Sequence, residues 1–295
     1  MKNLRSVAIH DGTFHADEVC ACALLLLFDL IDYDKIFRTR DVSIVESCEY
    51  VCDLGGIYDP ERKRFDHHQA NYLGLLSSAG MILLYLKTAN IIDSKFYDFI
   101  NSSIILGVDA HDIGNVRIEK GICTFSQVIS NFHPINYNSS IEEINECFYK
   151  ALDFTLAHFK RLKKRFYYVD GCKEKVKEVM KKGKYSLIFD ESLPWLECFF
   201  ELGGISHPAL FVVMPAREHW KLRGIPPSLE DRMNIRQPLP RKWAGLYGNE
   251  LKDVSGIDGA VFCHKGRFIS IWETKEDALE ALNKVLKLSG VNNGR

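Results

Sequence analysis

The sequence of 295 residues has no long hydrophobic run. The longest one, residues 19–28, is too short to span a bilayer. The first ten residues contain neither the apolar segment and small-residue cleavage site of a signal peptide nor the features of a transit peptide. We therefore expect a soluble, cytoplasmic protein with no signal peptide and no membrane partner.

An excess of charge of one sign is also missing, because 38 basic residues face 39 acidic ones. A protein that holds nucleic acid by charge over its whole surface needs a basic excess, so any phosphate binding has to come from local patches. The composition, 46% hydrophobic and 26% charged, is that of a globular protein and excludes low-complexity and fibrous classes. The length predicts one large or two medium domains.

The nine cysteines include no pair with C-x-x-C spacing. This excludes the usual zinc knuckle and the thioredoxin-like redox motif. We expect most of these thiols to be small core side chains in a protein of a reducing compartment.

The first half of the chain alternates short β-branched runs with helical patterns. Repeated alternation of this kind favours an α/β fold with a mostly parallel sheet covered by helices. In such folds, ligands bind beyond the carboxyl ends of the strands. The expected strands are residues 7–9, 36–39 and 50–52, and the expected helices are residues 16–31, 78–86 and 95–106.

The second half predicts a smaller α/β domain after a basic helical segment. Residues 160–184 hold eleven Lys or Arg against three Asp or Glu. That excess fits either a solvated helix face or a linker helix along which a phosphate backbone runs. We expect strands at 185–189, 209–213 and 260–263 and a last helix at 275–288. The predicted domains are 1–140 for the first α/β domain, 141–184 for the helical linker and 185–295 for the second α/β domain.

Histidines and carboxylates gather in four short clusters within the first 112 residues, each after an expected apolar run. A single such group is usually a cap or a satisfied polar side chain. Four groups crowded at one sheet edge would repel one another, and a divalent cation such as Mn²⁺, Mg²⁺ or Zn²⁺ would remove that penalty. Because the donors exceed the needs of one ion, we expect two, about 3.5–4 Å apart, with a shared carboxylate and water. The clusters are residues 10–18, 52–53, 66–68 and 109–112.

Residues 215–243 form a predicted loop in which seven basic residues outnumber three acidic ones, with two tryptophans interleaved. Arginine presents a fork to phosphate and an indole can stack on a base, so the loop suits single-stranded nucleic acid. The alternative is an irregular loop packed by its own tryptophans. His264, at the end of an expected strand, either contacts a phosphate or is a packed histidine. The candidate substrate-binding residues are Arg217, Arg223, Arg236, Arg241, Lys242, Trp243 and His264.

The motifs of this chain resemble the DHH phosphoesterase superfamily and, more closely, the melanocyte-proliferating-gene family of metal-dependent exonucleases. In the first half, the likeness lies in HDGTFHADE (10–18), DLGGIYD (53–59), FDHHQ (65–69) and GVDAHD (107–112). In the second half, it lies in PW (194–195), LPRKWAGL (239–246) and SGIDGAVFCH (255–264). The resemblance covers nearly the whole chain, and the first and third motifs are specific.

This resemblance implies a DHH-type catalytic domain followed by a smaller substrate-binding domain, and 3′ to 5′ hydrolysis of single-stranded RNA or short oligonucleotides. It implies two divalent metal ions, with Mn²⁺ preferred, and Asp53 as the carboxylate that bridges them. Asp66 would orient His67, and His68 would face the scissile phosphate as an acid or charge stabiliser. Eukaryotic members would work in the nucleus or the mitochondrion. The metal ligands would be His10, His15, Asp17, Asp53, His67 and Asp109.

Two other functions stay open. The same metal core would serve a hydrolase of short oligonucleotides or small phosphate compounds, because the chemistry is shared. Alternatively, the chain is a non-catalytic nucleic-acid-binding module, because His15 stands where the superfamily pattern has Asp and the spacing is one residue longer. The sequence also leaves open whether the chain forms an oligomer.

Overall fold

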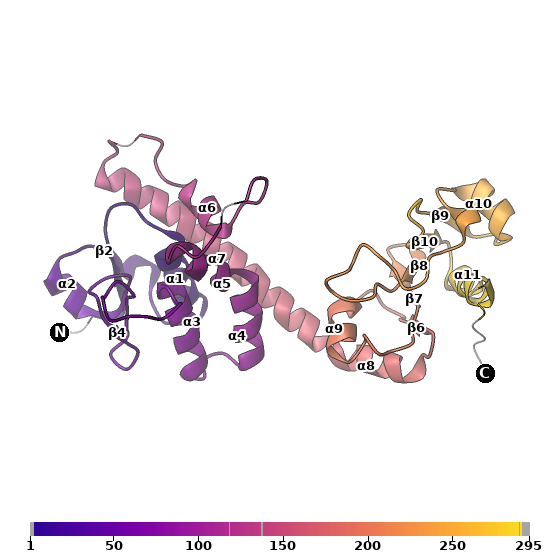
Figure 1. Ribbon diagram of the computed structural model, residues 1–295, viewed down its shortest axis with the longest axis horizontal. Helices are drawn as coiled ribbons and strands as arrows, with labels where there is room; N and C mark the ends of the chain where they lie inside the picture. Colours follow the sequence, from indigo (N-terminus) through magenta and orange to yellow (C-terminus); the bar gives the residue numbers. More distant parts are fainter. Residues whose placement is uncertain (1–2, 118, 137, 289, 291–295) are drawn as a thin grey trace. The chain divides into compact units, whose positions relative to one another are not determined.

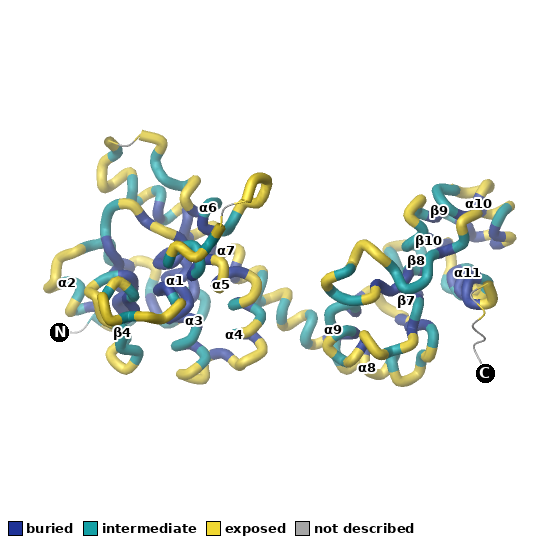
Figure 2. Tube along the Cα trace, viewed as in Figure 1, coloured by how far each residue is buried: buried dark blue, intermediate teal, exposed yellow. Residues whose placement is uncertain are grey.

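The computed structural model describes residues 3–117, 119–136, 138–288 and 290, so the extreme ends of the two predicted α/β domains, 1–2 and 291–295, lie outside it. The chain has two compact units, the N-terminal unit Met1–Phe166 and the C-terminal unit Tyr167–Arg295. None of the helices formed by the described residues combines the length and apolar character that crossing a bilayer requires. In both units, buried residues follow the strands and the inner faces of the helices (Figure 2).

The N-terminal unit, coloured from indigo through magenta in Figure 1, is built on a sheet in which parallel neighbours predominate. Its strands are β1 (Asn3–Ile9), β2 (Ile36–Arg38), β3 (Cys48–Cys52), β4 (Tyr58–Asp59) and β5 (Arg64–Phe65), in the spatial order β2-β1-β3-β5-β4. Val7 pairs in parallel register with Ile36 on one side and Tyr50 on the other. β5 also runs parallel to β3, whereas β4 is antiparallel to β5. The mixed α/β fold with a mostly parallel sheet is therefore confirmed.

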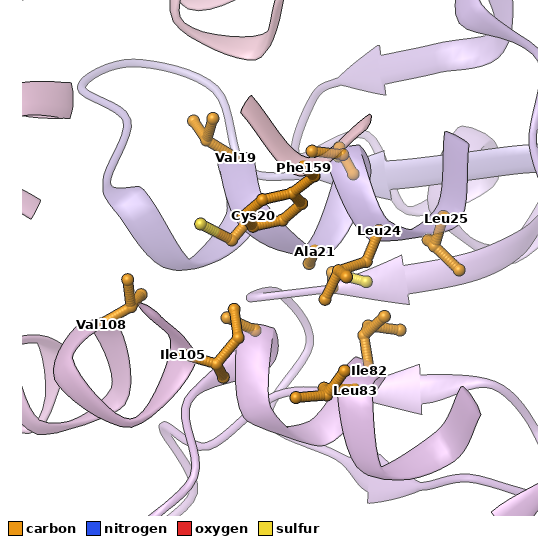
Figure 3. Packing of buried hydrophobic residues seen from close by; sticks show 14 of the residues in the cluster. Val19, Cys20, Ala21, Leu24, Leu25, Ile82, Leu83, Ile105, Val108 and Phe159 are labelled. Atoms are coloured by element: carbon orange, nitrogen blue, oxygen red, sulfur yellow. The ribbon is translucent and has the colours of Figure 1, made fainter. Parts of the chain in front are cut away.

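Helix α1 (Ala16–Leu27) supplies much of the core of this unit. Its apolar side chains meet those of α3 (Ser78–Thr88) and of the segment around Ile105 (Figure 3). Each fully buried leucine at such a contact contributes about 1.5–3 kcal/mol. The helix ends earlier than the predicted residue 31, because Asp29 adopts a left-handed backbone with φ of 57°. The Arg5 side chain bonds to Asp29 and so fixes this turn.

The helical pattern predicted over 95–106 is interrupted and extends further. Helix α4 (Ser94–Ile100) passes through a π-helical turn, Asn101–Ile105, into α5 (Leu106–Asp112). A π-turn inserts an extra residue into the helical repeat and so rotates the side chains beyond it. Asp109 and Asp112 lie on this helix, and Asp17 and Glu18 lie on α1, whereas His10, Asp53 and Asp66 follow strands.

Two short helices in the described part of the N-terminal unit are not predicted by the hydrophobic pattern. The side chain of Asp41 caps α2 (Val42–Ser47) by accepting backbone hydrogen bonds. Thr124 and Gln127 form a reciprocal capping box at α6 (Phe125–Ser130). Both helices are too short to display a helical period in the sequence, so only their capping residues could have indicated them.

The C-terminal unit contains a second sheet, mostly antiparallel. Its strands are β6 (Ser186–Ile188), β7 (Phe211–Ala216), β8 (His219–Gly224), β9 (Ala260–Cys263) and β10 (Ile269–Trp272), in the order β6-β7-β8-β10-β9. The predicted loop over 215–243 is wrong in its first part, because β8 forms a hairpin with β7 around Arg217 and Glu218. Arg217 takes the positive φ of 60° that such a two-residue turn needs.

Four further helices complete the C-terminal unit, and a fifth begins in the N-terminal unit. The long helix α7 (Ile141–Gly171) contributes Phe148, Leu152 and Phe159 to the core of the N-terminal unit. Part of the basic run is ion-paired: Lys173 lies 2.5 Å from Glu201, and Lys175 lies 2.5 Å from Glu191. The helices are α7 (Ile141–Gly171), α8 (Lys173–Lys182), α9 (Trp195–Glu201), α10 (Gly248–Ser255) and α11 (Lys275–Leu288).

Candidate metal centre

Three polar residues follow directly on three neighbouring parallel strands of the N-terminal sheet. His10 follows β1, Asp53 follows β3 and Asp66 follows β5. Because parallel strands end at the same edge of a sheet, these side chains are brought together there. Asp53 adopts a left-handed backbone with φ of 53°, which turns the chain away from the sheet while its N–H still bonds to the carbonyl of Phe65.

Histidines and carboxylates form three overlapping groups at this edge. In each group, one potential ligand atom from every member lies within 4.8 Å of the others. His15 belongs to two groups and Asp53 also belongs to two, so the groups are continuous with one another. Their members are His10, His15, Glu18 and Asp53 in the first, Asp53, His67 and His68 in the second, and His15, Asp17 and Asp112 in the third.

The ring of His10 is surrounded by negative charge. Its Nδ1–H donates to the carbonyl oxygen of Asp11 at 2.8 Å, and its Nε2 lies 3.2 Å from Asp53 Oδ2 and 3.3 Å from Glu18 Oε1. Burial opposes the charged imidazole, but hydrogen bonds to Asp53 and Glu18 raise the pKa of His10 to about 10. The site therefore attracts positive charge.

The environment of the Asp17 carboxyl indicates whether the site fits a metal ion. This carboxyl is fully buried, and neither of its oxygens has a hydrogen-bond partner in the part of the chain that the structure describes. Burial, followed by the charges of Asp53 and Glu18, raises its pKa well above the usual range. A buried carboxylate without partners is costly unless a cation binds it. Together with the neighbouring imidazoles, Asp17 fits a divalent cation.

Asp66 holds His68 and not, as predicted, His67. Its Oδ1 accepts the backbone N–H of His68 at 3.1 Å and the ring Nδ1–H at 2.8 Å, and its Oδ2 accepts the N–H of Gly56 at 2.5 Å. Burial alone would raise the pKa of Asp66, but these donors lower it. His67 instead places Nε2 3.0 Å from Asp112 Oδ2. The rings of His67 and His68 stack at 4.3 Å.

Asp109 lies outside the three groups, although the resemblance implied that it is a ligand. Its Oδ1 accepts hydrogen bonds from the N–H and hydroxyl of Ser77 and from the N–H of Gly80. A Cβ at Gly80 would collide with this carboxyl, so the glycine is required there. Asp112, one helical turn further along α5, contacts His67 instead. Glu18 and Asp112 were in the sequence clusters but were not singled out as ligands.

Replacement of Asp109 by Asn should change how stability depends on pH. Burial raises the pKa of Asp109 from 3.8 to about 6 in the folded chain. The folded state then binds a proton more tightly than the unfolded state, so the free energy of unfolding should fall by about 2 kcal/mol between pH 4 and pH 7. Asn keeps the acceptor for Ser77 but does not titrate.

Chemical denaturation of both metal-free proteins at several pH values measures this difference. The stability of Asp109→Asn relative to the unchanged chain should rise with pH across that window. Parallel pH profiles would contradict the assignment of Asp109 as a buried titrating group.

Two cavities adjoin the metal centre. The large cavity, of about 740 Å³, is bordered by His10 and Asp53, by the loop at Gly55 and Gly56, and by Arg40. The small cavity, of about 300 Å³, lies among residues of α1, α5 and α6. Both have His15 and His68 in their walls, and the His68 side chain is 63% exposed.

Two predicted substrate-binding residues serve the fold of the C-terminal unit. Trp243 is 1% exposed and packs against Trp272 with ring centroids 5.5 Å apart, so its face is closed to a base. Arg236 donates to backbone carbonyl oxygens of Gly204, His207 and Ala209, so its guanidinium is engaged inside the unit. Both predictions are therefore corrected.

The other predicted substrate-binding residues are more accessible or only partly engaged. Arg241 and Lys242 are exposed in a short 3₁₀ turn. Burial lowers the pKa of Arg223 in β8, and Arg217 sits at the tip of the β7–β8 hairpin. His264 accepts the N–H of Gly266 through Nδ1, which stabilises its own turn.

Fold and site together define an α/β protein with a divalent-metal centre at the carboxyl edge of a mostly parallel sheet. The family model MYG1_exonuc, described as "Uncharacterised protein family (UPF0160)", matches residues 6–286. The chain belongs to this family, so the resemblance identified from its motifs is confirmed.

Curated relatives match nearly the whole chain. The MYG1 protein of Chlamydia muridarum is 49% identical over 97% of this chain and 98% of its own length. The MYG1 exonuclease of Homo sapiens is 30% identical over 95% of this chain and 85% of its own length. Among solved structures, RecJ from Thermus thermophilus in complex with Mn²⁺ aligns at a TM-score of 0.28 and 12% identity, over 95% of this chain and 52% of that one.

Proposed function

We propose that this protein is a metal-dependent phosphodiesterase that acts as a 3′ to 5′ exonuclease on RNA. The observation that carries the proposal is the continuous set of three ligand groups, which share His15 and Asp53 and border a cavity open to a substrate. Membership of the MYG1 family supports it, as do the relatives in Homo sapiens and Bos taurus named MYG1 exonuclease.

The ligand groups are large enough for two divalent cations. His10, Glu18 and Asp53 would hold one, and Asp17, Asp112 and His67 would contribute to the other, with His15 close to both. Such cations would lower the pKa of a water molecule and offset the charge that builds on the phosphoryl oxygens. The mixture of imidazole and carboxylate ligands suits Mn²⁺, which we propose as the working ion.

His68 is placed to act on the leaving group. Asp66 accepts a hydrogen bond from Nδ1 of His68. This bond fixes the ring so that Nε2 points away from Asp66. The ring borders both cavities and is largely exposed, so Nε2 can donate a proton or a hydrogen bond to the oxygen that leaves the phosphorus. The chain itself thus supplies both the positioning carboxylate and the acid.

The test is an assay with end-labelled RNA of several lengths, DNA of the same sequence, and pyrophosphate, each with Mn²⁺, Mg²⁺ or Zn²⁺. We expect shortening of RNA from the 3′ end with Mn²⁺ and no product with a chelator. Activity confined to dinucleotides or pyrophosphate would contradict the exonuclease proposal in favour of a small-substrate hydrolase. Tight RNA binding without product under any ion would contradict catalysis.

A further inference from the structure

The loop between β1 and α1 carries two histidines of the metal centre. His10 stands at its start, and His15 stands at its end as the N-cap residue of α1. The centroids of the two rings are 5.7 Å apart, and Gly12 between them has a left-handed backbone with φ of 81°. A loop holds two ligands at a fixed separation only if its own peptide groups are held in place.

Arg38, at the end of β2, holds the middle of this loop. Its Nη2 donates a hydrogen bond to the carbonyl oxygen of Gly12, and its Nη1 donates to Asn145 Oδ1 of α7 at 2.6 Å. The guanidinium also lies over the Phe148 ring, 4.8 Å from the ring centroid. Because the guanidinium is planar and rigid, these contacts fix the position of Gly12 relative to α7.

His133, which follows α6, holds the end of the same loop. Its Nε2 lies 2.6 Å from the carbonyl oxygen of Phe14. A carbonyl oxygen can only accept, so Nε2 carries the proton and donates it. The imidazole also packs against the Phe14 ring, with centroids 4.5 Å apart and planes at 81°. The residue that precedes His15 is therefore held through both its backbone and its ring.

We propose that Arg38 and His133 are positioning residues of the metal centre. By holding two carbonyl groups of the β1–α1 loop, they fix the separation of His10 and His15 before a cation binds. Neither residue belongs to the three ligand groups, so each acts through the loop. Loss of either hydrogen bond leaves the loop more freedom, and cation binding then has to order it at a cost in free energy. The proposal rests on the metal-dependent function proposed above.

The charge of Arg38 leads to two opposite expectations for Mn²⁺ binding. Burial lowers the pKa of Arg38, and the nearby charge of Glu18 opposes this shift. A positive charge close to the centre repels a cation, so electrostatics alone predicts tighter Mn²⁺ binding in Arg38→Met. Positioning predicts binding about tenfold weaker, because the loop loses its donor. Titration of the metal-free full chain with Mn²⁺, followed by the electron paramagnetic resonance signal of the free ion, measures the affinity. Equal or tighter binding in Arg38→Met would overturn the role of Arg38.

Two substitutions of His133 separate the hydrogen bond from the ring. His133→Gln can still donate to the carbonyl oxygen of Phe14 but loses the ring, whereas His133→Phe keeps a ring but cannot donate. Positioning through the hydrogen bond predicts Mn²⁺ affinity about tenfold weaker in His133→Phe and close to normal in His133→Gln. Equal affinity in the unchanged chain and both variants would overturn the role of His133, as would a loss in His133→Gln as large as that in His133→Phe.

Arg64→Met is the matched control for a general loss of stability. Arg64 is another partly buried arginine of the N-terminal unit, and its Nη1 donates to the backbone carbonyl oxygens of Glu49 and Lys63. It lines neither of the cavities beside the metal centre. Arg64→Met should lower the free energy of unfolding in urea and leave Mn²⁺ affinity unchanged. A loss of affinity equal to that of Arg38→Met would show that stability, and not the loop, governs metal binding.

Cleavage of labelled RNA by the same proteins separates this proposal from the proposed function. If Mn²⁺ affinity depends on Arg38 and His133 but no RNA is cut, the positioning role stands and the exonuclease is wrong. If RNA is shortened but Mn²⁺ affinity is indifferent to both residues, the exonuclease stands and the positioning role is wrong.

Discussion

Asp53→Asn should lower kcat/KM on the nucleic-acid substrate on the order of 10³-fold and weaken Mn²⁺ binding. Asp53 belongs to two of the three ligand groups, so loss of its charge affects both. Asn keeps the size of the side chain and tolerates the left-handed backbone at this position, so the fold should persist. Steady-state kinetics with purified protein and a titration with Mn²⁺ measure the two effects.

Asp34→Asn is the matched control, because it removes an exposed carboxylate of the same unit outside both cavities. It should leave rate and metal binding unchanged. Near-normal activity together with unchanged metal affinity in Asp53→Asn would show that Asp53 holds no metal. An unchanged rate together with weakened Mn²⁺ binding would point to a contaminating nuclease.

His68→Ala should lower kcat by about 10²- to 10⁴-fold, the range for loss of a positioned acid. Metal affinity should change little, because His10, Asp17 and Asp53 are untouched. Asp66→Asn should have a smaller effect of the same kind, since Asp66 positions the His68 ring through Nδ1. Single-turnover cleavage beside a metal titration separates the two readouts.

His158→Ala removes an exposed histidine of α7 that is outside both cavities and should leave turnover unchanged. Its only described ring contact is with Phe125. If His68→Ala loses metal affinity in step with activity, His68 is a metal ligand through the second group and not the acid.

The sequence allowed the position of a site residue to be predicted wherever that residue directly follows a strand. His10, Asp53 and Asp66 each come directly after a short apolar run, and parallel strands place the residues at their carboxyl ends along one edge of the sheet. This rule needs no knowledge of helix packing. It therefore predicted the place of His10, Asp53 and the DHH segment without the structure.

This rule says nothing about site residues that lie on a helix. Asp109 and Asp112 are three positions apart on α5, which follows a π-helical turn that no pattern in the sequence predicted. Which of the two faces His67 depends on the rotation of that helix, which tertiary packing decides. The exchange of partners between His67 and His68 at Asp66 likewise depends on a loop conformation.

The C-terminal unit shows a second limit. An arginine and a tryptophan in a basic segment suit nucleic acid. The same side chains can equally well stabilise the fold from inside. Arg236 binds carbonyl oxygens and Trp243 fills the core, because a guanidinium can satisfy several buried acceptors and an indole buries a large area. Residue type alone does not separate these uses.

The long helix α7 determines where the chain can be shortened without exposing the core of the N-terminal unit. The turns of this helix that carry Phe148, Leu152 and Phe159 complete the core beneath the metal centre, although they lie after residue 140. A polypeptide ending at residue 140 would expose the surface that these side chains cover. Any shortened or circularly permuted version of this protein has to keep the chain intact through Phe166 if the N-terminal unit is to fold on its own.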